Sequence, residues 1–267
     1  MRRLGTLCVL VCTLAGAWAQ PAHAQDASPP GSMAAIGDSI TRATDACCWF
    51  GDHPGNSWST GAAAWDGVAS HYERLRSLNP AIAGRVYNDA VAGSKMAAGP
   101  GQAGVAVSQH AQYVTVLLGA NDLCTSTPQD MTPVDVFRVQ IKQTLETLAP
   151  STAHIFVSSI PNVYWLWQIE HTNPVAQFVW RAGRICQSLL AVERTELDRQ
   201  MVRQRNADFN TILAEECAAI AACRFDGNAV FDYQFTTAQV SRLDYFHPSL
   251  AGQAALADVT WANGWWS

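Results

Sequence analysis

The sequence has no long, charge-free apolar run beyond its first 24 residues, so that part of the chain offers no candidate for a membrane-spanning helix. The apolar run near the start, Leu7 to Trp18, is itself too short to cross a bilayer comfortably. It follows a positively charged start and precedes the small residues Ala22 and Ala24, as in secretory signal peptides. We therefore predict a signal peptide over residues 1–24, with a cut after Ala19 as the alternative. The mature protein is expected to be secreted, extracellular or periplasmic, without stable membrane insertion.

Basic residues are fewer than acidic ones. The chain has 17 Lys and Arg against 22 Asp and Glu, a formal net charge of -5. Loss of residues 1–24 removes two Arg and no acidic residue, which leaves 15 basic and 22 acidic side chains. An acidic surface repels phosphate backbones and anionic headgroups, so we expect no nucleic acid partner and no electrostatic binding to anionic lipid.

The sequence also lacks the spacing of a zinc site, because it contains neither C-x-x-C nor H-x-x-x-H. Eight cysteines are present, and two of them fall within residues 1–24. The six that remain are Cys47, Cys48, Cys124, Cys186, Cys217 and Cys223. An even number in an exported chain indicates three disulfides, whose pairing the sequence leaves open.

Two of the possible bridges are plausible from their positions. A Cys217–Cys223 bridge would close a short loop, and a Cys124–Cys186 bridge would join two loops near the expected site. The adjacent pair Cys47 and Cys48 is poorly suited to disulfide geometry. Each of these two cysteines is therefore expected to pair elsewhere, or one of them to stay free.

The sequence contains no internal repeat, and no linker follows residue 32. Residues 25–32 are polar and rich in proline, and we expect a flexible lead-in there. Residues 33–267 are then expected to form a single domain, and hydrophobic residues make up 49% of the chain, enough for a sizeable core. We expect a monomer.

Apolar, strand-like runs alternate with helix-like segments along this domain. The expected strands cover residues 33–39, 85–88, 113–118, 154–160 and 230–231. The expected helices cover residues 69–78, 105–112, 132–150, 189–222 and 249–261. This alternation predicts an α/β fold with a parallel sheet of about five strands and helices on both faces.

Ser39 lies at the carboxyl end of the first expected strand, within the stretch Ile36-Gly37-Asp38-Ser39-Ile40-Thr41. In an open α/β sheet, ligands bind at that edge. A serine in this position suits a nucleophile. The alternative is that Asp38 and Ser39 only cap a following helix, because both residue types are preferred at helix N-caps.

Two further strand ends carry residues of interest. The second strand leads into a loop that contains Gly93, and the third strand, the clearest in the chain, stops at Gly119-Ala120-Asn121-Asp122. Each residue also has a purely structural interpretation. Gly93 suits a turn glycine, and Asn121 suits a turn or a helix cap.

Asp244 and His247 stand three residues apart near the C-terminus. In a turn, this spacing brings the carboxylate to one imidazole nitrogen and leaves the other nitrogen facing a nucleophile. A serine hydroxyl needs such a positioned base, and the base needs an orienting partner. The alternative is that His247 and Pro248 form only a structural turn.

Taken together and in this order, the four blocks around Ser39, Gly93, Asn121 and His247 resemble the SGNH, or GDSL-type, hydrolase superfamily of esterases and lipases. The resemblance is closest to secreted bacterial members related to phospholipase B-like lipases, with Ile40 in place of the usual Leu. It implies a three-layer α/β/α sandwich of the flavodoxin-like kind. The G-x-S-x-G elbow of α/β-hydrolases is absent from the sequence, so the expected scaffold is a different serine hydrolase, and it needs no cofactor and no metal.

The resemblance also implies a role for each site residue. Ser39 is the expected nucleophile, His247 its general base and later the acid for the leaving group, and Asp244 the residue that orients His247. The oxyanion hole is expected to consist of the backbone N–H groups of Ser39 and Gly93 and the side-chain amide of Asn121. The neighbouring Asp38 and Asp122 are expected to hold the loops rather than to take part in the chemistry.

Two long loop-like regions contain aromatic residues that are candidates for an apolar acyl pocket: Trp49, Phe50, Trp58, Trp65, Trp165, Trp167 and Phe178. The alternative is that most of them are core residues. We expect hydrolysis of a carboxylic ester, lipid or lipid-like, through an acyl-serine intermediate. A carbohydrate esterase that removes acetyl groups is the alternative, and acyl transfer to an alcohol also stays open. A non-catalytic binding protein on the same scaffold is less favoured, because both Ser39 and His247 are present.

Overall fold

The computed structural model of the protein describes residues 28–151 and 153–267, so the expected signal peptide lies outside the described residues. Its centre is a five-stranded sheet made of β1 (Met33–Gly37), β2 (Val86–Asn88), β3 (Tyr113–Leu117), β4 (His154–Val157) and β5 (Cys223–Phe225). The strand order is β2-β1-β3-β4-β5, and every neighbouring pair is parallel. This is the flavodoxin-like order, so the expected α/β fold with about five parallel strands is confirmed.

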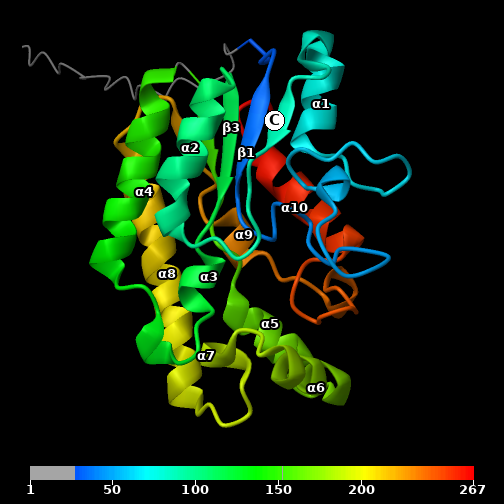
Figure 1. The fold of residues 1–267 in the computed structure, drawn as a ribbon, viewed down its shortest axis with the longest axis vertical. Coiled ribbons are helices and arrows are strands. Elements are labelled where there is room, and N and C mark those ends of the chain that lie inside the picture. The colour runs from blue at the N-terminus through cyan, green and yellow to red at the C-terminus, as the bar shows by residue number, and fades with distance from the viewer. Residues whose placement is uncertain (1–27, 152) are drawn as a thin grey trace, which may run out of the picture.

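Helices cover both faces of the sheet and make three layers (Figure 1). In this view α2 (Gly99–Ser108), α4 (Val134–Leu148) and α8 (Glu196–Ala218) lie on one side of β1 and β3, and α1 (His71–Leu78) and α10 (Leu250–Ala262) lie on the other. The shorter helices are α3 (Ala120–Leu123), α5 (Val163–Glu170), α6 (Pro174–Gly183), α7 (Gln187–Leu190) and α9 (Ala229–Asp232). Short 3-10 helices cover Pro54–Asn56, Pro80–Ile82, Met96–Ala98, Pro128–Asp130, Ala149–Ser151 and Thr237–Gln239. Within residues 28–151 and 153–267, none of the helices has the length and apolar character to cross a membrane.

The central strands are buried on both faces. Every residue of β1 and β3 is buried, and their sequences, MAAIG and YVTVL, are apolar almost throughout instead of alternating. A strand that is covered by helices on both faces requires this composition. The polar exception in β3 is Thr115, whose hydroxyl is 2.7 Å from the hydroxyl of Ser59.

The last strand was predicted wrongly. Residues 230–231 lie in the helix α9, and the fifth strand is Cys223–Phe225, which pairs with β4. A disulfide between Cys217 and Cys223 joins the end of α8 to the first residue of β5, so it helps to determine where the chain returns to the sheet. Val230 is fully buried, but two apolar residues in a row carry no period that would distinguish a strand from a helical turn.

Two helices also have different bounds from those expected. The helix expected to start at residue 105 begins at Gly99, where a Cβ atom would collide with the Thr144 side chain of α4. The glycine therefore permits close helix packing, although it reads as a loop residue in the sequence. The long helix expected over 189–222 is divided into α7 and α8, and Thr195 caps α8 in a capping box with Asp198.

The chain is held against the domain from residue 29 onward. The Asn79 amide donates hydrogen bonds to the carbonyl oxygens of residues 29 and 30, and the Gly31 N–H donates to Gln112 Oε1 at 2.6 Å. Residues 29–31, which belong to the lead-in expected over residues 25–32, are thus anchored to the domain by hydrogen bonds.

Two disulfides are formed, Cys124–Cys186 and Cys217–Cys223, the two bridges that their positions in the sequence favoured. Cys47 and Cys48 are not bonded to each other or to another cysteine. The described residues thus contain two of the three expected disulfides, because the other four cysteines there pair with one another. The expectation that Cys47 and Cys48 each pair elsewhere, or that one of them stays free, is wrong for these residues, since both are unbonded.

Candidate active site

The predicted site residues gather at the carboxyl edge of the sheet. Ser39 follows β1, Gly93 lies in the loop after β2, and Asn121 lies in α3, directly after β3. Strands β1 and β3 are neighbours, and the chain order changes direction between them. In open α/β sheets, ligands bind at such a point.

Gly37 allows the end of β1 to approach β3 closely. A Cβ atom on Gly37 would stand 2.7 Å from the Leu117 carbonyl oxygen and 2.5 Å from Thr41 Oγ1, so a larger residue does not fit. The buried Gln102 accepts a hydrogen bond from the Gly37 N–H at 2.7 Å and donates to Gly37 O at 3.0 Å and to Ser94 Oγ at 3.2 Å. Gln102 therefore connects β1 to the loop after β2. Sequence reasoning missed it, and its signal is a polar residue in a segment of small and apolar ones.

The turn after Gly37 presents Ser39. Asp38 Oδ1 accepts a hydrogen bond from the Ile40 N–H at 2.9 Å, and the Ser39 carbonyl oxygen accepts one from the Thr44 N–H at 3.0 Å. Residues 38–50 form turns and bends, and no helix begins in this segment. Ser39 is therefore not a helix cap, and its hydroxyl is free for another partner.

That partner is His247, which comes from the other end of the chain. His247 Nε2 lies 2.8 Å from Ser39 Oγ, and His247 Nδ1 is hydrogen-bonded to Asp244 Oδ2. The structure thus brings Ser39, His247 and Asp244 together in one hydrogen-bonded series. Asp244 is buried, and the His247 side chain is 13% exposed, so most of this series is shielded from water.

The three-residue spacing works because Asp244 organises its own turn. Asp244 Oδ1 accepts hydrogen bonds from the backbone N–H groups of Phe246, at 2.9 Å, and of His247, at 3.0 Å. The other carboxylate oxygen is then aimed at the imidazole. The Trp180 indole N–H donates to the Tyr245 carbonyl oxygen at 2.9 Å, and this bond attaches the turn to α6.

The electrostatics of the pair favour a charged carboxylate beside a basic imidazole. Burial opposes charge on His247, but the hydrogen bond and charge of Asp244, with the charges of Asp38 and Asp45, outweigh it and raise the pKa of His247. Burial also opposes charge on Asp244, but the bonds that it accepts from His247 and the turn lower its pKa overall.

Asp45 is a second carboxylate at this place, and sequence reasoning missed it because it lies in an irregular loop. A carboxylate oxygen of Asp45, a carboxylate oxygen of Asp244 and a ring nitrogen of His247 all lie within 4.8 Å of one another. The Asp45 residue is 8% exposed. Burial, together with the neighbouring Asp244, raises the pKa of Asp45. Among the described residues these atoms could hold a metal ion, but both ring nitrogens of His247 already make hydrogen bonds, to Ser39 and Asp244.

Asn121 lies between the residues that follow β1 and β2. Its Nδ2 donates to the Ser94 carbonyl oxygen at 3.0 Å and, more weakly, to Asp38 Oδ2 at 3.4 Å. The backbone N–H groups of Ser39 and Gly93 donate no hydrogen bond within the part of the chain that the structure describes. Gly93 has φ +79°, a left-handed conformation that suits glycine. The Asn121 amide thus bonds to Asp38, which precedes Ser39, and to Ser94, which follows Gly93. It therefore lies close to both free backbone N–H groups.

Asp38 and Asp122 hold the surrounding loops, in the positions expected for them. Burial raises the pKa of Asp38 to about 7, although the Ile40 N–H bond opposes the shift. Asp122 accepts hydrogen bonds from the Met96 N–H at 2.7 Å and from Thr132 Oγ1 at 2.6 Å. The first bond joins the chain after β2 to α3, and the second joins α3 to the segment before α4.

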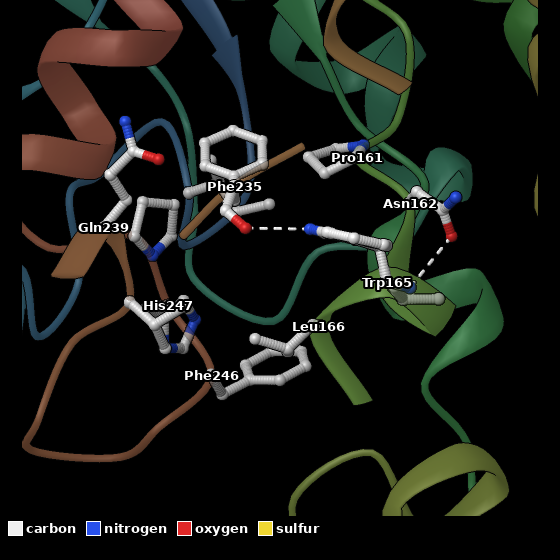
Figure 2. A pocket seen from close by; sticks show the side chains of 12 residues that line it. Pro161, Asn162, Trp165, Leu166, Phe235, Gln239, Phe246 and His247 are labelled. Carbon is white, nitrogen blue, oxygen red and sulfur yellow. Dashed lines mark hydrogen bonds between the residues drawn. The ribbon is translucent and has the colours of Figure 1, made fainter. Parts of the chain in front are cut away.

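An apolar pocket of about 60 Å³ opens beside His247 (Figure 2). It is lined by Ile40, Pro161, Asn162, Val163, Trp165, Leu166, Phe235, Gln239, Val240, Phe246, His247 and Pro248. Figure 2 shows Trp165 of α5 on one side of the pocket and His247 on the other. The Trp165 indole N–H donates to the Phe235 carbonyl oxygen at 2.8 Å, which joins the helix to the irregular chain after α9.

The aromatic residues proposed for an acyl pocket have different positions. Trp165 lines the pocket, and Trp58 is fully buried in the core. Trp167 lines a separate hollow with Arg199. The side chains that are largely exposed are Trp49, Phe50, Trp65 and Phe178. Of the seven, Trp165 is the one that lines the pocket beside His247, whose other apolar lining residues include Leu166, Phe235 and Phe246. The alternative that most of the seven are core residues is wrong, because four of them are largely exposed.

Residues 33–260 match the family described as GDSL-like Lipase/Acylhydrolase. No curated protein is similar enough to count as a match. An alpha/beta hydrolase enzyme from the metagenome of Lake Arreo, Spain, is 15% identical, with a TM-score of 0.55 over 88% of this chain and 96% of its own. An acetylxylan esterase from Geobacillus stearothermophilus is 18% identical, with a TM-score of 0.53 over 88% of this chain and 95% of its own.

At these identities the solved structures show a shared fold, and the family match carries the assignment. That match runs from the first residue of β1 into the last helix, and so includes the carboxyl edge with Ser39, Asn121 and His247. The resemblance read from the sequence motifs is confirmed at the level of the family. The chain belongs to the GDSL-like lipase/acylhydrolase family and is a carboxylic ester hydrolase.

Proposed function

We propose that the protein hydrolyses carboxylic esters in two steps through an acyl group on Ser39. The observation that carries this proposal is the hydrogen-bonded series from Asp244 through His247 to Ser39, with 2.8 Å between His247 Nε2 and Ser39 Oγ. A serine hydroxyl becomes an effective nucleophile only when a positioned base can take its proton.

In the first step, Ser39 Oγ attacks the ester carbonyl carbon while His247 Nε2 takes the hydroxyl proton. The bond from that carbon to the alcohol oxygen then breaks, and His247 gives the proton to the leaving oxygen. In the second step, a water molecule attacks the acyl carbon, His247 takes a proton from it, and the proton returns to Ser39 Oγ as the acid leaves. Asp244 keeps the imidazole oriented with its proton on Nδ1 throughout.

The negative charge that develops on the carbonyl oxygen needs hydrogen-bond donors. The free backbone N–H groups of Ser39 and Gly93 and the amide of Asn121 are the donors that we assign to it. The 3.4 Å bond from Asn121 to Asp38 is the weaker of its two, so it is the bond that an oxyanion would replace. A donor of this kind contributes about 3–4 kcal/mol of transition-state stabilisation.

We further propose that the ester carries an apolar, lipid-like group. The pocket beside His247 is lined mostly by aliphatic and aromatic side chains, and burial of apolar surface contributes about 25 cal/mol per Å². A group bound there would lie next to the proton acceptor of the reaction. A polar sugar would find few hydrogen-bond partners in this pocket, among them Asn162 and Gln239.

A short acyl group is the second candidate, and the pocket volume favours it. One water molecule needs about 10–15 Å³ on the same measure, so about 60 Å³ holds only a few heavy atoms. An acetyl or butyryl group fits this space, whereas a long chain would have to continue along the surface. Removal of acetyl groups from a carbohydrate is therefore the alternative activity, as in the acetylxylan esterase of similar fold.

We also propose that the protein is secreted after loss of residues 1–24. The Cys124–Cys186 and Cys217–Cys223 bridges support this proposal, because disulfides persist in oxidising compartments. N-terminal sequencing of the protein recovered from the culture medium or periplasm tests it. A mature chain that starts at Gln25 is the expected result, and a chain that keeps residues 1–24 in the cytoplasm would contradict it.

The proposed reaction is tested with p-nitrophenyl esters from acetyl to palmitoyl, using Ser39→Ala as the matched control. We expect turnover by the wild type and none by Ser39→Ala, with equal melting temperatures. Activity that persists on palmitoyl esters would support a lipid substrate, and activity confined to acetyl and butyryl esters would support the short-acyl alternative. Equal turnover by both proteins would remove Ser39 as the nucleophile.

A further inference from the structure

Cys47 and Cys48 carry no disulfide, yet their sulfur atoms lie closer together than van der Waals contact allows. Their Sγ atoms are 2.6 Å apart. Carbon atoms in contact stand about 3.5–4.0 Å apart and sulfur atoms are larger, whereas a disulfide bond measures about 2.05 Å. The pair is therefore compressed well inside van der Waals contact, toward the distance of a bond.

The backbone around the pair is folded to bring the two side chains together. The Trp49 N–H donates to the Cys47 carbonyl oxygen at 2.7 Å, and Cys48 between them has φ +63°. A hydrogen bond from residue i+2 to residue i around a positive φ is a γ-turn of the rare, strained kind. Ala43 and Asp45 also have positive φ, at 51° and 56°. Strain of this kind persists only where the surrounding structure enforces it.

Other residues close this loop at both ends. The Gly51 N–H donates to Asp45 Oδ1 at 2.6 Å, and the Asp45 N–H donates to the Gly51 carbonyl oxygen at 2.8 Å. Ser241 Oγ donates to the Asp45 carbonyl oxygen at 2.5 Å, and the Leu250 N–H donates to the Ala46 carbonyl oxygen at 3.0 Å. The segment 45–51 is thus a closed loop packed against the chain that carries Asp244 and His247.

We propose that Cys47 and Cys48 are a disulfide-forming site, and that a bond between these adjacent residues closes the loop 45–51. Among the described residues, the other four cysteines are already paired, so Cys47 and Cys48 are the two that remain there to pair with each other. The proposal is independent of the proposed function. It reverses the sequence expectation that adjacent cysteines are poor partners, because the γ-turn provides the geometry that an ordinary strand or helix does not.

The bond forms by exchange with an external disulfide, for which oxidised glutathione is a sufficient acceptor. The exposed Cys48 attacks one sulfur of the acceptor, which breaks the acceptor's bond, gives a mixed disulfide and releases one thiol. Cys47 then loses its proton and attacks Cys48 Sγ, which forms the bond between the two residues and releases the second thiol. The protein loses two electrons and two protons, and the acceptor gains them. Burial raises the pKa of the Cys47 thiol to about 11, so the exposed Cys48 is the better first nucleophile.

The bond would keep Asp45 in its place. Asp45 begins the loop and lies within 4.8 Å of Asp244 and His247, while the two cysteines line a hollow with Asp45 and Arg242. Oxidation of the pair stops the independent rotation of two side chains that line this hollow, and it fixes the turn that follows Asp45. The disulfide would therefore form part of the wall of the hollow, beside Asp45, which lies next to Asp244 and His247.

Peptide mapping tests the proposal directly, because trypsin leaves the Cys47–Cys48 pair and the Cys217–Cys223 pair in separate peptides. Residues 43–74 form one tryptic peptide that contains Cys47 and Cys48 and no other cysteine. Residues 206–224 form another that contains only the Cys217–Cys223 bridge, and this peptide is the matched control. The full-length protein is equilibrated with an excess of oxidised over reduced glutathione, denatured, treated with N-ethylmaleimide and digested.

We expect the 43–74 peptide without N-ethylmaleimide and two hydrogen masses lighter than its reduced form, like the 206–224 control. The 43–74 peptide with two N-ethylmaleimide groups, beside an oxidised control, would overturn the proposal. The same peptide with glutathione attached, or joined to a second copy of itself, would also overturn it. The readout is mass alone, so it stands whether or not the protein hydrolyses esters.

A reduction series with dithiothreitol adds a second measurement. Exposed disulfides are reduced more easily than buried ones, and Cys48 is exposed whereas Cys217 is 1% exposed. We expect the 43–74 peptide to become reactive toward N-ethylmaleimide at a lower reductant concentration than the 206–224 control. Simultaneous reduction of both peptides only upon unfolding would contradict an accessible bond at this loop.

Discussion

The site has two sides that are built in different ways. The polar side comprises Ser39, Gly93 and Asn121, each of which follows a parallel strand. The apolar side comprises Trp165, Leu166, Phe235 and Phe246. Its residues come from α5 and from irregular chain between α9 and α10. Individual hydrogen bonds bring these segments together, such as the one from the Trp165 indole N–H to the Phe235 carbonyl oxygen.

The difference shows how rigid and adaptable parts can share one site. The polar side rests on backbone geometry that leaves little room for change, because Gly37 cannot accept a Cβ and Gln102 bonds to both of its backbone groups. On the apolar side, the lining side chains determine the volume of the pocket, and this volume changes with each substitution. We therefore expect changes on the polar side to lower the rate for every ester and changes on the apolar side to alter the preference among esters.

The largest effect is expected where His247 joins the two sides. His247→Ala removes the base and should lower kcat about 10⁴- to 10⁶-fold for all esters, with little change in melting temperature. His110→Asn is the matched control, because His110 is exposed and its left-handed backbone suits Asn. Wild-type rates in His247→Ala, measured with p-nitrophenyl acetate, would refute the role of this residue.

A smaller uniform loss is expected for Asn121→Ala. The variant lacks one donor to the oxyanion, so kcat should fall about 10²- to 10³-fold while KM changes little. Because Asn121 also bonds to Ser94 and Asp38, thermal unfolding must be measured beside the kinetics. A rise in KM with an unchanged kcat would show that Asn121 only binds the substrate.

The apolar side is tested by Trp165→Ala, which enlarges the pocket and leaves the polar side intact. We expect kcat/KM for butyryl relative to acetyl esters to change by about tenfold, the scale of a few apolar contacts. Trp167→Ala is the control, because Trp167 lies two residues away on the same helix and lines a different hollow. Equal changes in both variants would show that helix stability, not the pocket, sets the preference.

The smallest effect concerns the pH dependence, which both sides share through His247. The reaction needs neutral His247, whose pKa is raised above the usual 6.5, so kcat/KM should fall as the pH falls through a midpoint above 6.5. Asp45→Asn removes a negative charge that helps to raise this pKa, so the midpoint should move to lower pH. A pH–rate profile of both proteins measures the shift, and an upward or absent shift would contradict this role of Asp45.

The polar side was accessible from the sequence, and the apolar side was not. A buried strand such as β3 has a continuous apolar run, and the residue that follows it is placed by the sheet, so Ser39 and Asn121 could be located without coordinates. Phe235 and Phe246 lie in irregular chain whose course depends on distant contacts. No local period marks such residues.

The same distinction explains the other errors. Asp45 lies in a loop shaped by positive φ angles and by bonds to residues about 200 positions away, so its approach to Asp244 has no local signal. The strand expected at 230–231 failed because two apolar residues suit a strand or a helical turn equally well. Gly99 read as a loop residue, although it starts a helix that packs closely on α4.

Ser39 and His247 are separated by 208 positions, so the reacting pair is assembled from nearly opposite ends of the chain. Under the proposed mechanism, a copy that stops before residue 247 has the nucleophile without its base. Such a copy lacks the proposed base even where it contains all five strands of the described sheet, the last of which ends at Phe225. The proposed chemistry therefore depends on a segment that follows the sheet in the chain, and the fold of the sheet alone does not provide it.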